Sequence, residues 1–140
     1  NQPLTDGTTP VFAAVFNDHT EALKLLIASG ADVHRLKKTG ATALFIAASA
    51  QVETTATMRV LLEHGADPNV ATKLFYWTPL LMAVVGNFPD AVSLLFDYGA
   101  RLDALSVTVA FCFWFTRRRT EVIDLLIFRA REGNPRGFRL

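Results

Sequence analysis

The phrase ALKLLIASGAD at residues 22–32 returns twice in this 140-residue chain, as MRVLLEHGAD at 58–67 and as AVSLLFDYGA at 91–100. A second phrase precedes each copy: TPVFAA at 9–14, TALFIAA at 42–48 and TPLLMA at 78–83. The opening threonines lie 33 and 36 residues apart, and each closing glycine follows its threonine by 21 to 23 residues. Self-similarity at such a period is typical of architectures in which short units bury their apolar faces only against their neighbours. The chain is therefore predicted to be a stack of repeats.

Each repeat is predicted to contain two helices. A Thr-Pro or Thr-Ala pair suits the start of the first, because the hydroxyl can cap the helix and proline fits its first turn. In the second helix, Leu23, Leu26 and Ile27 have the spacing of a buried stripe. Small residues in the first helices would let neighbouring units approach closely (Ala14, Ala47, Ala83), and a glycine in left-handed conformation is expected to end each second helix (Gly30, Gly65, Gly99). We expect inner helices near 10–17, 43–50, 79–86 and 108–116, and outer helices near 20–28, 55–64, 89–98 and 120–131.

The order of these phrases resembles the ankyrin repeat family, whose unit is a turn followed by two antiparallel helices. The resemblance implies an all-α repeat solenoid, with paired helices joined by β-hairpin-like loops. We expect one domain over residues 1–140, with repeats at about 6–38, 39–74, 75–106 and 107–131 and a tail at 132–140. The fourth repeat is degenerate: EVIDLLI at 121–127 echoes residues 21–27, but Val109-Ala110 replaces Thr-Pro. A terminal repeat of this kind is expected to act as a cap.

The chain departs from the family at one recurring position. The histidine that usually follows Thr-Pro-Leu is replaced by Phe12, Phe45, Leu81 and Cys112. We expect these side chains to pack in the apolar interior instead of forming a hydrogen-bond network. The same burial is expected of Phe111, Trp114 and Phe115, which have helical spacing.

Composition excludes several other classes of protein. Residues of the hydrophobic types make up 51% of the chain and charged ones 19%, which excludes intrinsic disorder. A single cysteine, Cys112, excludes an intrachain disulfide and favours a reducing compartment. No apolar run approaches the ~20 residues of a membrane helix. Because the polar N-terminus has neither an initiator Met nor a signal segment, we expect a piece of a longer intracellular protein, in the cytoplasm or alternatively the nucleus.

The formal net charge of +1 is the sum of two opposite halves. Residues 1–104 carry a net charge of −3, and residues 105–140 carry +4, mainly from arginine. A run of three arginines, Arg117, Arg118 and Arg119, is predicted to lie in the turn between the helices of the fourth repeat. It is a candidate contact for an anion or an acidic partner, with a solubilising cap as the simpler interpretation.

Catalytic motifs are absent from the sequence. We find no Gly-rich phosphate loop, no nucleophile elbow and no Cys/His spacing for zinc, and His19, His34 and His64 lie in different repeats. We therefore expect no enzymatic activity, no cofactor and no metal ion in this segment.

The resemblance implies a partner on the concave side, which inner helices and hairpin tips form. The matching inner-helix positions are unusually apolar: Phe16, Ile46, Met82, Val85 and Phe113. They are either a groove for a partner helix or peptide, or they are covered by tighter curvature or by neighbouring repeats.

The hairpin between repeats two and three is the sharper candidate. Its tip reads Lys73-Leu74-Phe75-Tyr76-Trp77, with Tyr76 where the family has glycine. Aromatic residues are enriched at binding hot spots, and in an extended segment Phe75 and Trp77 would face one way and Tyr76 the other. Alternatively, some rings fold back over neighbouring helices. The preceding tip, residues 35–38, is basic, and an isolated charged turn is usually only solvated.

A further candidate is a modification site. Leu61 with Asp67-Pro68-Asn69 is similar to the setting in which asparaginyl hydroxylases modify ankyrin hairpins, which marks Asn69 as a candidate for hydroxylation. Together these observations favour a non-enzymatic module that binds a protein or peptide through hairpin tips and the concave face. The alternative is a recruitment segment of a larger enzyme or effector whose catalytic domain lies outside these residues. Nucleic acid is a less favoured partner, and the oligomeric state is left open.

Overall fold

The computed structural model describes residues 6–50, 54–102, 104, 107–109, 111–112 and 121–133 of the chain. Within them the bounded helices are α1 (Pro10–Phe16), α2 (Thr20–Ala28), α3 (Ala43–Ala48), α4 (Thr55–Glu63), α5 (Pro79–Gly86), α6 (Pro89–Asp97) and α8 (Glu121–Gly133). Each bound agrees with the sequence expectation to within two residues. Of the expected inner helix at 108–116, residues 108, 109, 111 and 112 are helical and the others lie outside the described residues.

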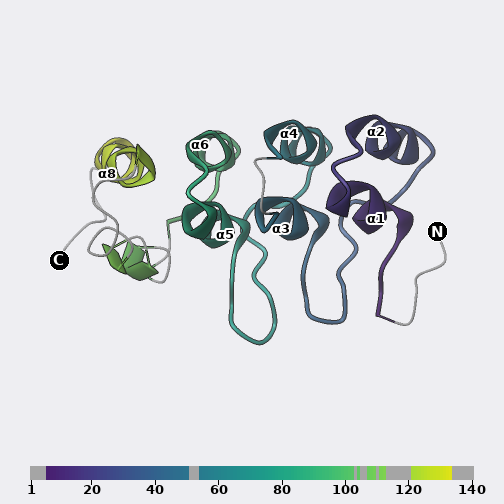
Figure 1. Ribbon diagram of the computed structural model, residues 1–140, viewed down its shortest axis with the longest axis horizontal. Helices are drawn as coiled ribbons and strands as arrows, with labels where there is room; N and C mark the ends of the chain where they lie inside the picture. The colour runs from purple at the N-terminus through teal and green to yellow at the C-terminus, as the bar shows by residue number, and fades with distance from the viewer. Residues whose placement is uncertain are drawn as a thin grey trace.

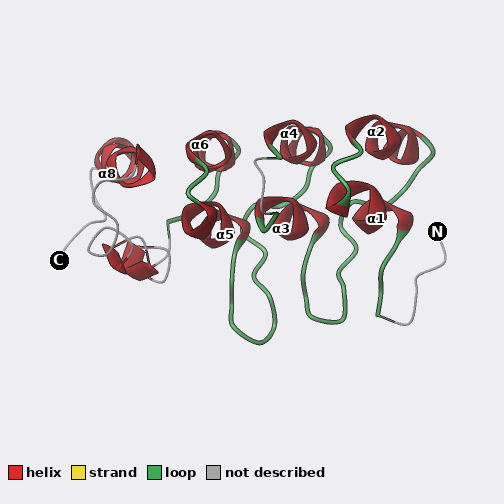
Figure 2. Ribbon diagram, in the orientation of Figure 1, coloured by secondary structure: helices red, strands yellow, loops and turns green. Residues whose placement is uncertain are grey.

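The helices form two rows, as Figure 1 shows. The outer row contains α2, α4, α6 and α8, and the inner row contains α1, α3 and α5, with each helix contacting the next in its row. The loops that join successive repeats project from the inner row (Figure 2), and no strand occurs in the described part of the chain. The expectation of an all-α repeat solenoid is confirmed.

Local sequence explains where the helices start and stop. The Thr42 Oγ1 accepts a hydrogen bond from the Phe45 N–H at 3.0 Å, and Thr78 caps α5 in the same way from Leu81 at 3.2 Å. Thr9 does not follow this pattern, because its buried hydroxyl has no hydrogen-bond partner among the described residues. The glycines after α2, α4 and α6 have φ between +86° and +89°, so the predicted left-handed ends are confirmed.

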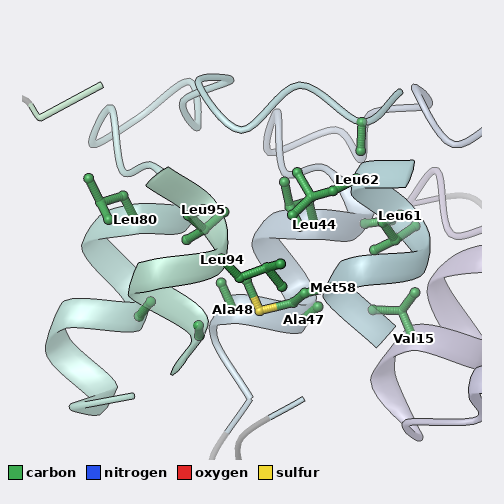
Figure 3. Close-up of a cluster of buried hydrophobic side chains, with 14 of the residues drawn as sticks. Val15, Leu44, Ala47, Ala48, Met58, Leu61, Leu62, Leu80, Leu94 and Leu95 are labelled. Atoms are coloured by element: carbon green, nitrogen blue, oxygen red, sulfur yellow. The ribbon is translucent and has the colours of Figure 1, made fainter. Parts of the chain in front are cut away.

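The core is continuous along the stack. Figure 3 shows part of it, where side chains from α1, α3, α4, α5 and α6 form one cluster. Leu23, Leu61 and Leu95 are completely buried in the outer helices, and each such leucine contributes about 1.5–3 kcal/mol relative to an exposed one. The alanines of the inner helices are buried between neighbouring units as expected (Ala14, Ala47, Ala83).

The position where the family has histidine is apolar and buried in the first three repeats. Phe12, Phe45 and Leu81 are all at most 9% exposed, so that expectation is confirmed. It is wrong for Cys112 and for Phe111, which are exposed. Both follow α6 in the degenerate repeat, whose sequence has lost the Thr-Pro start of the others. Trp114 and Phe115 lie outside the described residues.

The hairpins stack on one another through their backbones. The Lys38 N–H donates to the Asp6 carbonyl at 3.2 Å, and the Lys73 N–H donates to the Thr39 carbonyl at 3.0 Å. Among the described residues after α6 this ladder has no fourth member, and Ala104, five residues after Gly99, is already helical. The same offset from Gly30 and Gly65 falls in hairpins. The third hairpin is therefore the last in the described row.

Candidate functional site

The tip of the third hairpin exposes four consecutive apolar side chains, residues 74–77, which we call the finger. The exposed fractions are 75% for Leu74, 60% for Phe75, 73% for Tyr76 and 40% for Trp77. The rings of Phe75 and Trp77 stack, with centroids 5.0 Å apart and planes 26° from parallel. The segment is not extended as the sequence expectation assumed, because Tyr76 is left-handed, but the Phe75 and Trp77 rings still pack together and form a preorganised aromatic surface.

An additional residue makes the finger longer than the hairpin before it. In the second hairpin the Lys37 N–H donates to the Ala41 carbonyl, whereas in the third the Thr72 N–H donates to the Trp77 carbonyl, one residue further along. The Trp77 N–H also donates to the Thr72 Oγ1 at 3.2 Å. These bonds close the base of the finger and leave its tip in solvent.

Tyr76 has a backbone conformation that usually requires glycine. Its φ is +53°, and the residues in the corresponding positions of the first two hairpins are Gly7 and Gly40, with φ of +84° and +82°. A non-glycine residue in this region is strained by roughly 1–2 kcal/mol. A Cβ at Gly40 would lie 2.9 Å from the Lys73 backbone nitrogen. A hairpin packed on Tyr76 as closely as Lys73 packs on Gly40 would meet the tyrosine Cβ, whereas a Cβ at Gly7 would come no closer than 3.4 Å to the second hairpin.

The inner-helix face is only partly open. Phe16 is 79% exposed and Val85 is 38% exposed, whereas Ile46 and Met82 are half-buried and pack against the core. The apolar positions expected on the concave side are thus present on α1, α3 and α5, but only those at the ends of α1 and α5 present much surface. Phe113, assigned to the same face, lies outside the described residues, as do Arg117, Arg118 and Arg119.

The basic tip, residues 35–38, belongs to the second hairpin, and the finger belongs to the third hairpin, which stacks on it. Lys37 lies 4.0 Å from the Asp6 carboxylate and 5.4 Å from the centre of the Phe12 ring. Hydrogen bonds from the hydroxyl and N–H of Thr8 lower the pKa of Asp6, and the Lys37 ammonium lowers it further. Lys37 thus already has partners within the protein, Asp6 and the Phe12 ring, whereas Arg35 and Lys38 are exposed.

Asn69 has a structural role in the loop after α4. Its side-chain N–H donates to the Gly99 carbonyl at 3.0 Å, and its Oδ1 accepts from the Arg101 N–H at 2.7 Å. The Asp67 carboxylate accepts from the Asn69 backbone N–H at 2.8 Å. The amide therefore joins two successive loops, and an enzyme that modified Asn69 would have to displace these bonds.

The described residues contain no group of His, Cys, Asp and Glu side chains that could hold a metal ion. The Nδ1 of His64 lies 2.7 Å from the Val60 carbonyl at the end of α4, which is a structural contact. None of the helices within the described ranges is long and apolar enough to cross a membrane.

The sequence interpretation missed several exposed apolar residues. Leu25 is 70% exposed, although the corresponding residues of the next two repeats, Val60 and Leu94, are buried. Leu25 lies in the first repeat, so aligning the repeats and asking which residues lack a preceding unit would have marked it as a candidate for exposure. Leu36, at 47%, and Leu74 could have been added to the candidate surface from their positions in the tips.

Comparisons with known proteins agree with this architecture. The model of the family described as ankyrin repeats (3 copies) matches residues 1–72, half of the chain. The glycerophosphocholine phosphodiesterase GDE1 of Eremothecium gossypii is 34% identical over 80 residues, which are 56% of this chain. The aligned part is only 6% of that phosphodiesterase. The periodic helix pairs and the family match together show that the chain belongs to the ankyrin repeat family.

Proposed function

We propose that this segment is a non-enzymatic protein-interaction module. It binds a partner protein or peptide through the finger, with the open parts of the concave face around Phe16, Ile46, Met82 and Val85 as additional contacts. Ankyrin repeats typically bind proteins, which supports the general role. The observation that carries the specific proposal is the exposure of four consecutive apolar side chains at one hairpin tip, in a chain that buries Phe12, Phe45 and Leu81.

Leaving the aromatic rings of the finger in water is unfavourable, because apolar surface is more stable when it is buried. Burying an aromatic side chain removes 150–250 Å² from solvent, and residues of this kind dominate the energetics of interfaces. Because Phe75 and Trp77 already stack on each other, a partner need not order them on binding, and less conformational entropy is lost. The rings do not fill a gap in the core.

The test compares partner capture with stability. The segment, immobilised as wild type and as Phe75→Ala/Trp77→Ala, is incubated with cell extract, and captured proteins are identified and then titrated as purified components. We expect the double variant to bind at least about tenfold more weakly, since two hot-spot rings are lost, while its thermal unfolding midpoint changes little. Leu25→Ala changes an apolar residue on the outer helix α2 that is more exposed than Phe75 or Trp77, and as the control it should bind as wild type. A large loss of stability with intact binding would assign the finger a structural role.

A second candidate function is recruitment within a larger enzyme. The phosphodiesterase that resembles this segment is much longer than the aligned region, which amounts to 6% of its length. In that case the repeats would bring a catalytic domain to its substrate or location without contacting the reacting atoms. Deleting them from the parent protein would then change its location or partners but leave turnover of a small soluble substrate unchanged. Reduced turnover of that substrate would contradict this candidate.

The remaining candidates are smaller extensions of the proposal. Phe113 would extend the concave contact into the fourth repeat, and Arg117, Arg118 and Arg119 would contact an acidic surface of the partner. In an intracellular location, in the cytoplasm or nucleus, asparaginyl hydroxylases would be able to reach Asn69. Peptide mass spectrometry of the protein isolated from its own cells would detect one added oxygen on the peptide that contains Asn69.

A further inference from the structure

The hairpin that carries the basic tip and the hairpin that carries the finger lie against each other in space. The Lys73 N–H donates to the Thr39 carbonyl at 3.0 Å, and a Cβ on Gly40 would lie 2.8 Å from the Lys73 Cγ. The stem of Lys73 therefore lies over the second hairpin, where that hairpin meets the finger. Figure 1 shows the two loops next to each other below α3 and α5. The basic tip and the finger thus belong to adjacent, stacked hairpins.

This surface concentrates positive charge in an otherwise acidic segment. Residues 1–104 carry seven basic side chains and a net charge of −3, yet four of the seven lie in the two tips: Arg35, Lys37, Lys38 and Lys73. Lys37 pairs with Asp6. The other three are exposed, and within the described residues no acidic side chain forms an ion pair with them. Their charges are available to an external partner.

The same surface is apolar between the charges. Leu36 is 47% exposed beside Arg35, and the neighbouring hairpin exposes the apolar side chains of the finger from Leu74 onward. The exposed side chains of the finger are the groups that this surface offers to an occupant. Exposed rings next to unpaired cations favour a ligand that carries apolar groups and negative charge together.

We propose that the basic tip and the finger form one binding surface for an acidic peptide segment with apolar or aromatic anchors. This inference rests on the proposed function, because it names the chemistry of the partner that the finger binds. The anchors pack on the Phe75–Trp77 pair and on Tyr76, while carboxylates of the peptide pair with Arg35, Lys38 and Lys73. Stacking rings and cations also suit single-stranded nucleic acid. Three unpaired cations beside the exposed side chains of Leu36 and the finger suit a ligand with a few charges and apolar side chains better than a strand charged at every nucleotide, so an acidic peptide fits better.

The experiment uses fluorescent synthetic 12-residue peptides in which Leu and Phe alternate with Glu, with Lys, or with Ser. Anisotropy titrations at low and moderate salt give their affinities for the whole chain. We expect the Glu peptide to bind at least about tenfold more tightly than the Lys peptide, with an advantage that shrinks as salt screens the charges. The double variant Arg35→Gln/Lys38→Gln should weaken binding of the Glu peptide by about fivefold and reduce its salt dependence. Phe75→Ala/Trp77→Ala should weaken binding of both the Glu and Ser peptides.

A matched control removes the same charge elsewhere. Lys24→Gln/Arg59→Gln changes two exposed basic residues on the outer helices α2 and α4, and it should bind the Glu peptide as wild type. Equal affinity for the Glu and Lys peptides, or no effect of Arg35→Gln/Lys38→Gln, would overturn this inference. So would absence of peptide binding, or tighter binding of a poly-deoxythymidine oligonucleotide than of the Glu peptide. The proposed function fails separately, if the finger double variant captures its protein partner as strongly as wild type.

Discussion

Replacing Tyr76 with glycine should separate binding from stability. Tyr76 is 73% exposed, so truncating its side chain removes little packing. Its φ of +53° costs roughly 1–2 kcal/mol in a non-glycine residue, and Tyr76→Gly relieves that cost. Glycine in turn raises the entropy of the unfolded chain by roughly 0.5–1 kcal/mol. The net change in unfolding free energy is therefore between about zero and +1.5 kcal/mol, or up to roughly 6 °C in the midpoint of thermal unfolding.

Binding should move in the opposite direction. A tyrosine at an interface hot spot contributes about 2 kcal/mol, so Tyr76→Gly should weaken the partner complex by roughly thirtyfold, measured by calorimetric titration alongside thermal unfolding. Tyr76→Asn provides the control, because asparagine tolerates the left-handed region and also removes the ring. It should lose binding to a similar extent. A fall of several degrees in the midpoint for both variants would show that the Tyr76 side chain stabilises the fold, and unchanged affinity would show that its ring does not contact the partner.

Three further predictions concern stability. Gly40→Ala should destabilise the protein by about 1–2 kcal/mol more than Gly30→Ala in urea unfolding. Both glycines have positive φ, but of the two only Gly40 would place a Cβ against a neighbouring backbone. Equal losses would show that the hairpins are not stacked this tightly. Leu61→Ala, at a completely buried site, should cost about 2–5 kcal/mol in the same assay, and a smaller loss would contradict close packing between α4 and its neighbours. In an NMR titration the Asp6 carboxyl should have a pKa below its ordinary value of 3.8, so its contribution to stability is present above pH 3.8 and is lost as pH falls through the lowered pKa. Thr8→Ala should raise the Asp6 pKa toward 3.8, and an unchanged pKa would show that Thr8 is not the cause.

Much of the fold follows from short-range sequence signals. Thr78-Pro79 and the glycines after the outer helices specify where helices begin and end through local backbone chemistry, and the repeat period specifies that the helices stack. Contacts between repeats could not be derived in this way. The Thr57 hydroxyl donates to the Asp18 carboxylate and lies 2.9 Å from the Thr20 hydroxyl. These pairs depend on how two repeats are placed against each other, and nothing in either repeat alone specifies them.

The candidate surface was predictable in part. The finger stands out in the sequence because aromatic residues replace a polar tip that contains glycine. The contact between its hairpin and the second hairpin does not, since Lys73 and Gly40 are far apart in the chain and meet only through hairpin stacking. The exposure of Phe111 was predicted wrongly for a related reason. Helical spacing indicates that residues share a face, but a neighbouring element decides whether that face is covered.

The central claim is that a bound partner covers the finger, and fluorescence quenching tests it most directly. The chain has two tryptophans, Trp77 and Trp114, so a Trp114→Phe variant reports on Trp77 alone. Acrylamide should quench this tryptophan readily in the free protein, where Trp77 is 40% exposed. When the partner identified by capture, in a form lacking tryptophan, is added to saturation, the quenching constant should fall by at least about half. An unchanged constant in a complex shown to be saturated would contradict the account, because the partner would then bind elsewhere.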